Sequence, residues 1–180
     1  MVDDSVIDAA IAASPYDAAF VVAIETHHRA LAGFAALLCG DRDEADDIAA
    51  EAWARVWTAY RHGRVDDLVG YARRTVANLV KDRRRRRRLE RRELSTCRLD
   101  WRSADDGRWA EKPENSFDTA VRDALLSLPI DQRAVVVCRH VLDLSEIDTA
   151  ELLRIRLGTV KSRLARGLAA LRSRLGDHDD

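Results

Sequence analysis

Proline and glycine are scarce in this sequence of 180 residues, which contains 3 prolines and 8 glycines. Both residues interrupt helices, so their scarcity favours a helical chain. Strand-like alternation of apolar and polar residues is also missing. Apolar residues instead recur at three- and four-residue steps, as in Phe20, Ile24, Leu31, Phe34 and Leu38. The sequence therefore predicts an all-α protein.

Long apolar runs and paired cysteines are missing too. No run approaches the roughly 20 apolar residues of a membrane span, and the N-terminus is acidic where a secretory signal would be basic. Cys39, Cys97 and Cys138 form an odd, scattered set, which suits a reducing compartment better than a disulfide framework. We therefore expect a cytoplasmic protein that makes no membrane contact.

Motifs of enzymes and metal sites are absent from the sequence. There is no glycine-rich phosphate loop, no HExxH and no nucleophile elbow. His27 and His28 lie on a predicted helix without a nearby cysteine or a suitably spaced carboxylate, so surface or core-edge positions suit them better than metal ligation. We expect no catalytic residue, no metal and no cofactor.

Net charge is almost absent, but the charged residues are segregated along the chain. The total is 30 Lys and Arg against 31 Asp and Glu, a net charge of −1. Residues 72–98 carry 12 basic and 3 acidic side chains, and residues 152–176 carry 7 basic and no acidic ones. Acidic segments flank both patches. The neutral total therefore does not exclude a polyanionic partner.

Three helices are predicted in the first half. The first ends at Gly40-Asp41, the second begins near Asp43, and the third begins near Asp66 and leads into six consecutive arginines, Arg83 to Arg88. Such a run gives salt-dependent affinity for nucleic acid without base information, whereas the alternative is a disordered tail. Tyr71, an aromatic with basic and polar neighbours, suits unstacked single-stranded bases.

Helical periodicity is lost over residues 93–116, which we interpret as a linker. Trp101 and Trp109 within it indicate either packing on a neighbouring domain or ordering inside a larger complex. Helices then follow over 117–128, from a cap at Asp131, over about 145–153, and after a short turn at 154–156. The last two have the spacing of a helix-turn-helix, whose second helix enters the DNA major groove. The alternative is a structural helix with a solvated basic face.

Particular strings of residues carry a family resemblance. GTVKSRLARG at 158–167, together with Leu128-Pro129 upstream, resembles region 4 of the extracytoplasmic-function (ECF) sigma factors of bacterial RNA polymerase. DEADDI at 43–48, with EAW at 51–53, resembles the region 2 helix, and Tyr71, Asn78 and Asp82 resemble the end of region 2. The similarity covers about residues 16–92 and 117–175, in the family's order.

The resemblance implies two small helical domains joined by a flexible linker. The segments would be an N-terminal extension over 1–15, region 2 over 16–92, a linker over 93–116 and region 4 over 117–176. It also implies a function without catalysis: binding core RNA polymerase at its clamp and flap, recognising the minus-10 and minus-35 promoter elements, and promoting transcription initiation. The implied partners are core RNA polymerase, promoter DNA and an anti-sigma factor.

Three sets of contact residues are carried over from the family. The polymerase contacts would be Asp46, Asp47, Glu51, Arg55 and Trp57. The minus-10 contacts would be Arg64, Tyr71, Arg73, Arg74, Asn78, Lys81, Arg83 and Arg84. The minus-35 contacts would be Arg154, Arg156, Thr159, Lys161, Ser162, Arg163 and Arg166.

The sequence also departs from the family pattern. Arg154 replaces a glycine usual in the turn, and if that position needs a positive φ, arginine there costs about 1 kcal/mol. Alternatively, Arg154 adds a phosphate contact. Ala50 stands where glutamine is common, and Tyr71 stands where tryptophan is common. Two other functions stay open: a helix-turn-helix regulator that binds duplex DNA without polymerase, and an interaction module that titrates polymerase.

Overall fold

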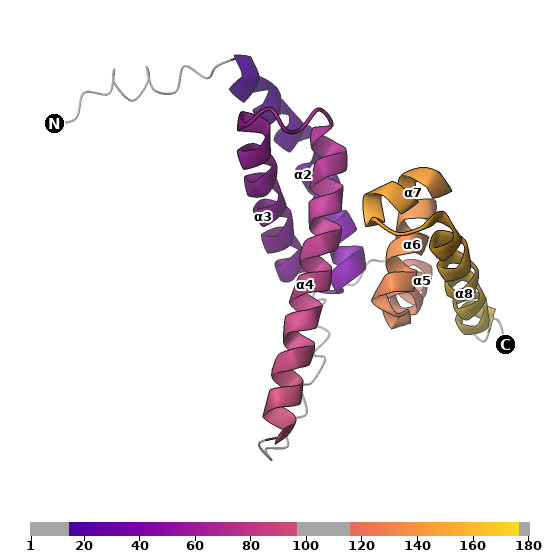
Figure 1. The fold of residues 1–180 in the computed structure, drawn as a ribbon. Coiled ribbons are helices and arrows are strands. Elements are labelled where there is room, and N and C mark those ends of the chain that lie inside the picture. Colours follow the sequence, from indigo (N-terminus) through magenta and orange to yellow (C-terminus); the bar gives the residue numbers. More distant parts are fainter. Residues whose placement is uncertain (1–14, 97–115, 177–180) are drawn as a thin grey trace.

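Helices and turns make up the described part of the chain, which in this computed structural model comprises residues 15–96 and 116–176. Within these residues there are seven helices and no strand, arranged as two groups (Figure 1). The predicted all-α fold is confirmed. Cys97, Trp101 and Trp109 lie outside the described residues, so the expectations about them and about the linker stay predictions.

The first group is a bundle of α2 (Pro15–Cys39), α3 (Arg42–Arg61) and α4 (Leu68–Thr96). Its centre holds fully buried side chains, among them Phe34, Ile48 and Val76. Helix α2 ends where predicted, at Gly40, whose φ of +89° favours glycine. Asp41 then caps α3, because its side chain accepts a hydrogen bond from the Glu44 N–H.

Helix α4 begins with a tight turn and continues through the whole arginine run. Asp67 accepts a hydrogen bond from the Gly70 N–H, and a β-carbon at position 70 would displace that carboxylate. The helix runs on to Thr96, past residue 93, and its second half projects beyond α2 and α3 (Figure 1). The arginines are therefore helical.

The second group contains α5 (Ser116–Ser127), α6 (Ile130–His140), α7 (Glu146–Leu153) and α8 (Leu157–Gly176). Asp131 does not cap α6, so that prediction was wrong: Pro129 occupies the N-cap, and Asp131 lies in the first turn. Its carboxylate instead accepts a hydrogen bond from Arg163 Nη2 at 3.2 Å. Helices α6 and α8 approach closely at Gly167, where a β-carbon would lie 2.8 Å from Val136 Cγ2.

The two groups pack against each other. Helix α2 contacts α5 and α6, and α4 contacts α7, so that the buried side chains form one continuous cluster. At one edge of this interface a β-carbon on Gly40 would lie 3.2 Å from Leu126 Cδ2. Leu126 is half-buried but is not among the buried core residues of its own group.

A buried arginine joins the groups. Arg133 of α6 is 3% exposed. Its Nη1 donates a hydrogen bond to the Leu38 carbonyl of α2 at 2.8 Å, and its Nη2 donates to the Leu126 and Leu128 carbonyls. Burial lowers the pKa of Arg133 to about 10, and repulsion from Arg84 adds to the shift. The guanidinium is therefore charged at neutral pH, and backbone oxygens accept hydrogen bonds from its Nη1 and Nη2, whereas its buried Nε has no partner among the described residues.

We expect Arg133→Met to lower the free energy of unfolding by about 2–4 kcal/mol, because buried carbonyls lose their donors. Urea denaturation followed by circular dichroism measures this loss. Arg172→Met, at an exposed arginine of α8 in the same group, is the matched control, with an expected change within about 0.5 kcal/mol. Equal losses for the two variants would contradict the bonding role of Arg133.

Candidate nucleic-acid interface

The acidic start of α3 includes two exposed carboxylates that were predicted as polymerase contacts. Asp46 and Asp47 are exposed, and neither forms an ion pair within the described residues. Of the predicted polymerase contacts, these two are the carboxylates most accessible to another protein.

Trp57 lies at the edge of an apolar groove on another side of α3. Its ring centroid is 4.8 Å from that of Phe20, and the Arg61 guanidinium carbon lies 5.7 Å from it. The groove has a volume of about 440 Å³. It is lined by Phe20, Val21, Ile24, Trp53, Ala54 and Trp57.

Glu51 differs from the two aspartates because both of its oxygens are already bound. Oε1 accepts a hydrogen bond from Arg55 Nη2 at 2.7 Å, and Oε2 accepts one from Arg83 Nη2 at 2.9 Å. The bond from Arg83 is the main cause that holds the pKa of Glu51 below its usual range. This carboxylate is therefore used within the chain.

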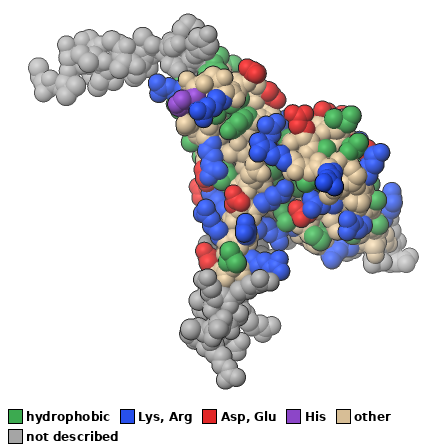
Figure 2. Space-filling model, viewed as in Figure 1, with side chains coloured by type: hydrophobic (Ala, Val, Ile, Leu, Met, Phe, Trp, Pro, Cys, Tyr) green, Lys and Arg blue, Asp and Glu red, His purple; other side chains and the backbone are tan. Residues whose placement is uncertain are grey.

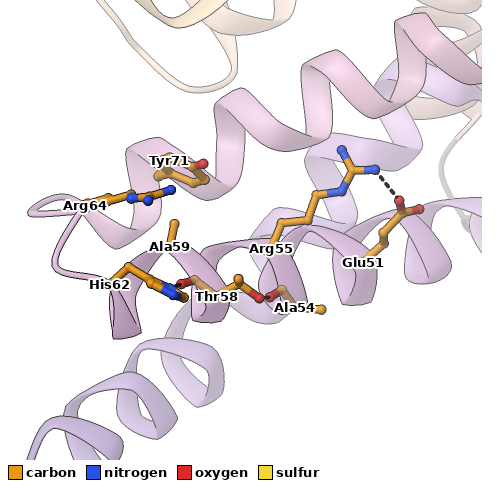
Figure 3. A pocket seen from close by; sticks show the side chains of 8 residues that line it. All are labelled: Glu51, Ala54, Arg55, Thr58, Ala59, His62, Arg64 and Tyr71. Carbon is orange, nitrogen blue, oxygen red and sulfur yellow. Dashed lines mark hydrogen bonds and ion pairs between the residues drawn. The ribbon is translucent and has the colours of Figure 1, made fainter.

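A second pocket, of about 480 Å³, opens between α3 and the start of α4 (Figure 3). It brings Arg64 and Tyr71, both predicted minus-10 contacts, together with Glu51 and Arg55, predicted as polymerase contacts. The residues that line it are Glu51, Ala54, Arg55, Thr58, Ala59, His62, Arg64 and Tyr71. Sequence reasoning missed Thr58 and His62. His62 Nδ1 lies 2.6 Å from the Thr58 carbonyl oxygen.

The second group covers part of α4. Among the predicted contacts there, Asn78 is exposed, whereas Arg73, Arg74 and Lys81 are half-buried. Arg74 Nη2 lies 4.0 Å from the Glu151 carboxylate of α7. Burial raises the pKa of Cys138 in α6 to about 12, and the positive charges of Arg73 and Lys81 oppose this shift.

The two arginines predicted as minus-10 contacts from the run lie differently. Arg83 is half-buried and bound to α3, whereas Arg84 is exposed and close enough to Arg133 to affect its pKa. They therefore occupy different sides of α4.

The helix-turn-helix is formed by α7 and α8. Ser145 and Asp148 form a capping box at the start of α7. Arg154 ends α7 in the left-handed region, with φ 51° and ψ 51°. The turn therefore does need a positive φ, the case in which arginine is strained.

The predicted minus-35 residues gather at the start of α8 and in the turn before it. Arg154, Arg156, Lys161, Ser162 and Arg166 are exposed, whereas Thr159 and Arg163 are half-buried. Lys161 Nζ lies 3.8 Å from Glu146, and Arg166 Nε donates to the Ser162 carbonyl. Lysine and arginine side chains are abundant over this group and over α4 on the face shown in Figure 2.

Two searches of the described residues were negative. No group of three His, Cys, Asp or Glu side chains there is arranged to hold a metal ion. None of the described helices combines the length and apolarity that a membrane crossing requires.

Comparison with known proteins matches both groups to one family. Residues 23–90 match the family described as Sigma-70 region 2, and residues 118–171 match Sigma-70, region 4. The RNA polymerase sigma-E factor of Streptomyces avermitilis is 36% identical over 160 residues, covering 87% of this chain and 84% of that protein. The ECF RNA polymerase sigma factor SigM of Mycobacterium tuberculosis is 34% identical over 161 residues, covering 88% and 78%.

Solved structures share the fold. The sigma factor RpoE of Bartonella quintana, solved with the anti-sigma factor NepR, matches with a TM-score of 0.68 at 20% identity, covering 87% of this chain and 96% of that one. CnrH, solved with the cytosolic domain of CnrY, matches with a TM-score of 0.63 at 24% identity, covering 96% and 97%.

We expect Arg154→Gly to raise the free energy of unfolding by about 0.5–1 kcal/mol, because glycine adopts the left-handed region without strain. Arg156→Gly removes the same charge two residues later, outside that conformation, and should not be stabilising. Urea denaturation of both variants makes the comparison. A loss of stability in Arg154→Gly as large as in Arg156→Gly would show that the turn is unstrained.

Proposed function

This chain belongs to the extracytoplasmic-function subfamily of sigma-70 factors, and we propose that α3 holds core RNA polymerase while α4 and α8 hold the two promoter elements. It is an RNA polymerase sigma factor, which binds core RNA polymerase, recognises minus-10 and minus-35 promoter elements and promotes transcription initiation. The residues that make these contacts are the proposal.

The observation that carries the assignment is the presence of two separate basic surfaces in one chain. One lies along α4 beside the pocket with Arg64 and Tyr71, and the other lies at the start of α8. A regulator that binds duplex DNA alone needs only the second surface. Two surfaces, one of them suited to unstacked bases, favour a protein that reads a duplex and an opened strand together.

For the minus-35 element we propose that α8 enters the major groove by its N-terminal end. Arg156, Lys161 and Arg166 are exposed there and supply donors for phosphates or guanine edges. Arg163 Nη2 donates a hydrogen bond to the Asp131 carboxylate, so the other guanidinium nitrogens of Arg163 are the ones available to DNA. Thr159 and Ser162 add short polar contacts, and Arg154 faces the backbone from the turn.

For the minus-10 element we propose that the pocket at the start of α4 accepts an unstacked base. Its volume of about 480 Å³ lies within the roughly 300–1,000 Å³ usual for small ligands. Tyr71 offers a ring for stacking and Arg64 offers a donor fork. Arg73, Arg74, Asn78 and Lys81 then continue along α4 as contacts for the same strand.

For polymerase we propose Asp46 and Asp47 as the main charged contacts, with Trp57 as an apolar neighbour. In this proposal the chain catalyses no reaction, because polymerase carries out the RNA synthesis. The chain acts in the cytoplasm, where polymerase is. An anti-sigma factor is a further proposed partner, since the sigma factor RpoE of Bartonella quintana was solved with the anti-sigma factor NepR.

Run-off transcription with core polymerase tests this function. Initiation at defined sites only when chain and core are both present is expected. A shift of duplex DNA without core would favour a classical regulator, and binding to core without transcripts would favour a titrating module. Asp46→Asn/Asp47→Asn should weaken core binding, whereas Asp43→Asn, an exposed acid on the same helix, should change it less.

The packing of α5 against the end of α2 gives a separate prediction for the free chain. Leu126→Glu places a carboxylate against the end of α2 and should separate the two groups, because the charge loses hydration on docking. Small-angle X-ray scattering should show a larger radius of gyration, and single-stranded DNA should bind more tightly. Ser127→Glu adds the same charge at the adjacent, exposed position and should change neither. An unchanged radius for Leu126→Glu would refute the docking argument.

A further inference from the structure

Four charged side chains join α3 to the projecting half of α4. Glu44 Oε1 lies 2.8 Å from Arg87 Nη2 and 3.9 Å from Arg83 Nη1. Arg83 Nη2 donates to Glu51 Oε2 at 2.9 Å. Arg83 thus bridges the two glutamates, and Arg87 binds one of them. We refer to Glu44, Glu51, Arg83 and Arg87 as the brace.

Glu44 is the buried member of the brace. Its side chain is 8% exposed, whereas that of Arg87 is 57% exposed. A buried carboxylate is tolerated when it is paired, and both of its ion pairs come from α4. The N-terminal turn of α3 also favours the negative charge through the helix dipole. The burial of Glu44 therefore depends on the position of α4.

The spacing of the arginines sorts them by side. Residues four apart lie on one side of a helix, so Arg83 and Arg87 both face α3. Arg84, Arg85, Arg86 and Arg88 are exposed, and none has an ion pair within the part of the chain that the structure describes. Six adjacent like charges repel one another, and the two glutamates offset that repulsion on one side only.

We infer that Arg83 and Arg87 are positioning residues, held by Glu44 and Glu51, and that the DNA phosphates contacted by the run are bound by Arg84, Arg85, Arg86 and Arg88. The inference rests on the proposed role of α4 at the opened promoter strand. Glu44 fixes the direction and rotation of the projecting half of α4, so the other four arginines meet the strand on a rigid helix. Arg83 then leaves the set of minus-10 contacts, and Glu44 joins the residues on which those contacts depend.

Hydrogen exchange of the full chain tests the positioning role. Glu44→Gln should speed exchange of the α4 amides around residues 83–90 several-fold, because the two arginines lose their buried acceptor. Glu90→Gln makes the same change of charge on an exposed residue of α4 and should leave the exchange of these α4 amides unchanged. Equal exchange in wild type and Glu44→Gln would overturn the inference.

The salt dependence of DNA binding tests which arginines of the run bind phosphates. In complex with core polymerase, Arg84→Gln/Arg88→Gln should reduce the slope of log affinity against log salt by about 1.4, since each phosphate contact on a single strand contributes about 0.7. The probe is a fluorescein-labelled single strand of mixed sequence. Arg83→Gln/Arg87→Gln removes the same charge and should leave the slope unchanged. A reduction as large as that of the first pair would assign Arg83 and Arg87 to phosphates and overturn the inference.

The two proposals fail separately. A chain that starts no transcripts with core would refute the proposed function, while the exchange experiment would still report on the brace. Normal transcription with no difference between Glu44→Gln and Glu90→Gln in exchange would refute the brace alone.

Discussion

The arrangement of the two helical groups depends on one buried cation. Arg133 holds the turn between α5 and α6 through the Leu126 and Leu128 carbonyls, and it reaches the end of α2 through the Leu38 carbonyl. A guanidinium removed from water is expensive unless its donors are satisfied, so the α2 end and the α5–α6 turn must lie close enough to share it. The same contact leaves α7 over α4 and half-covers Arg73, Arg74 and Lys81. The surface proposed for the opened strand is thus shaped by an interaction outside it.

The net charge of each basic segment is larger than the positive charge that it can present to DNA. Residues 72–98 are strongly basic, yet Arg83 and Arg87 are neutralised by Glu44 and Glu51 across the bundle. Arg163 is likewise paired with Asp131, and Lys161 lies near Glu146. Some of the acidic and basic side chains therefore pair with each other inside the chain, and only the others can form separate surfaces for two partners. A smaller set of charged side chains has no ion pair within the described residues, including the acidic Asp46 and Asp47 and the basic Arg84 and Arg156. Electrostatic recognition of a partner depends on this set.

Much of the fold could be predicted because its signals are local. Gly40, the capping residues Asp41 and Ser145, and the apolar periodicity mark helix limits within a few residues. The sequence could not predict the left-handed conformation of Arg154, because arginine, unlike glycine, does not indicate a positive φ. Only the cost of such a conformation could be stated in advance. The cap assigned to Asp131 failed because Pro129 already occupies the N-cap, leaving the carboxylate for Arg163. The brace and the docking of α7 on α4 join residues far apart in the chain, and no periodic pattern records such pairings. The pocket residues Thr58 and His62 were missed for the same reason.

Docking of the two groups also bears on how a partner is bound. A partner that needs both surfaces uncovered binds only the separated form, so its apparent affinity falls in proportion to the population of that form. If Asp46 and Asp47 hold core polymerase as proposed, polymerase can engage before separation, because these exposed residues lie away from the interface formed by α2 and α4 with α5, α6 and α7. Single-stranded DNA can reach the exposed Arg84, Arg85, Arg86 and Arg88 of the docked chain, but Arg73, Arg74 and Lys81 are half-buried there. Polymerase would then come first and full engagement of DNA second, because the docked chain leaves Asp46 and Asp47 exposed and only part of α4 accessible.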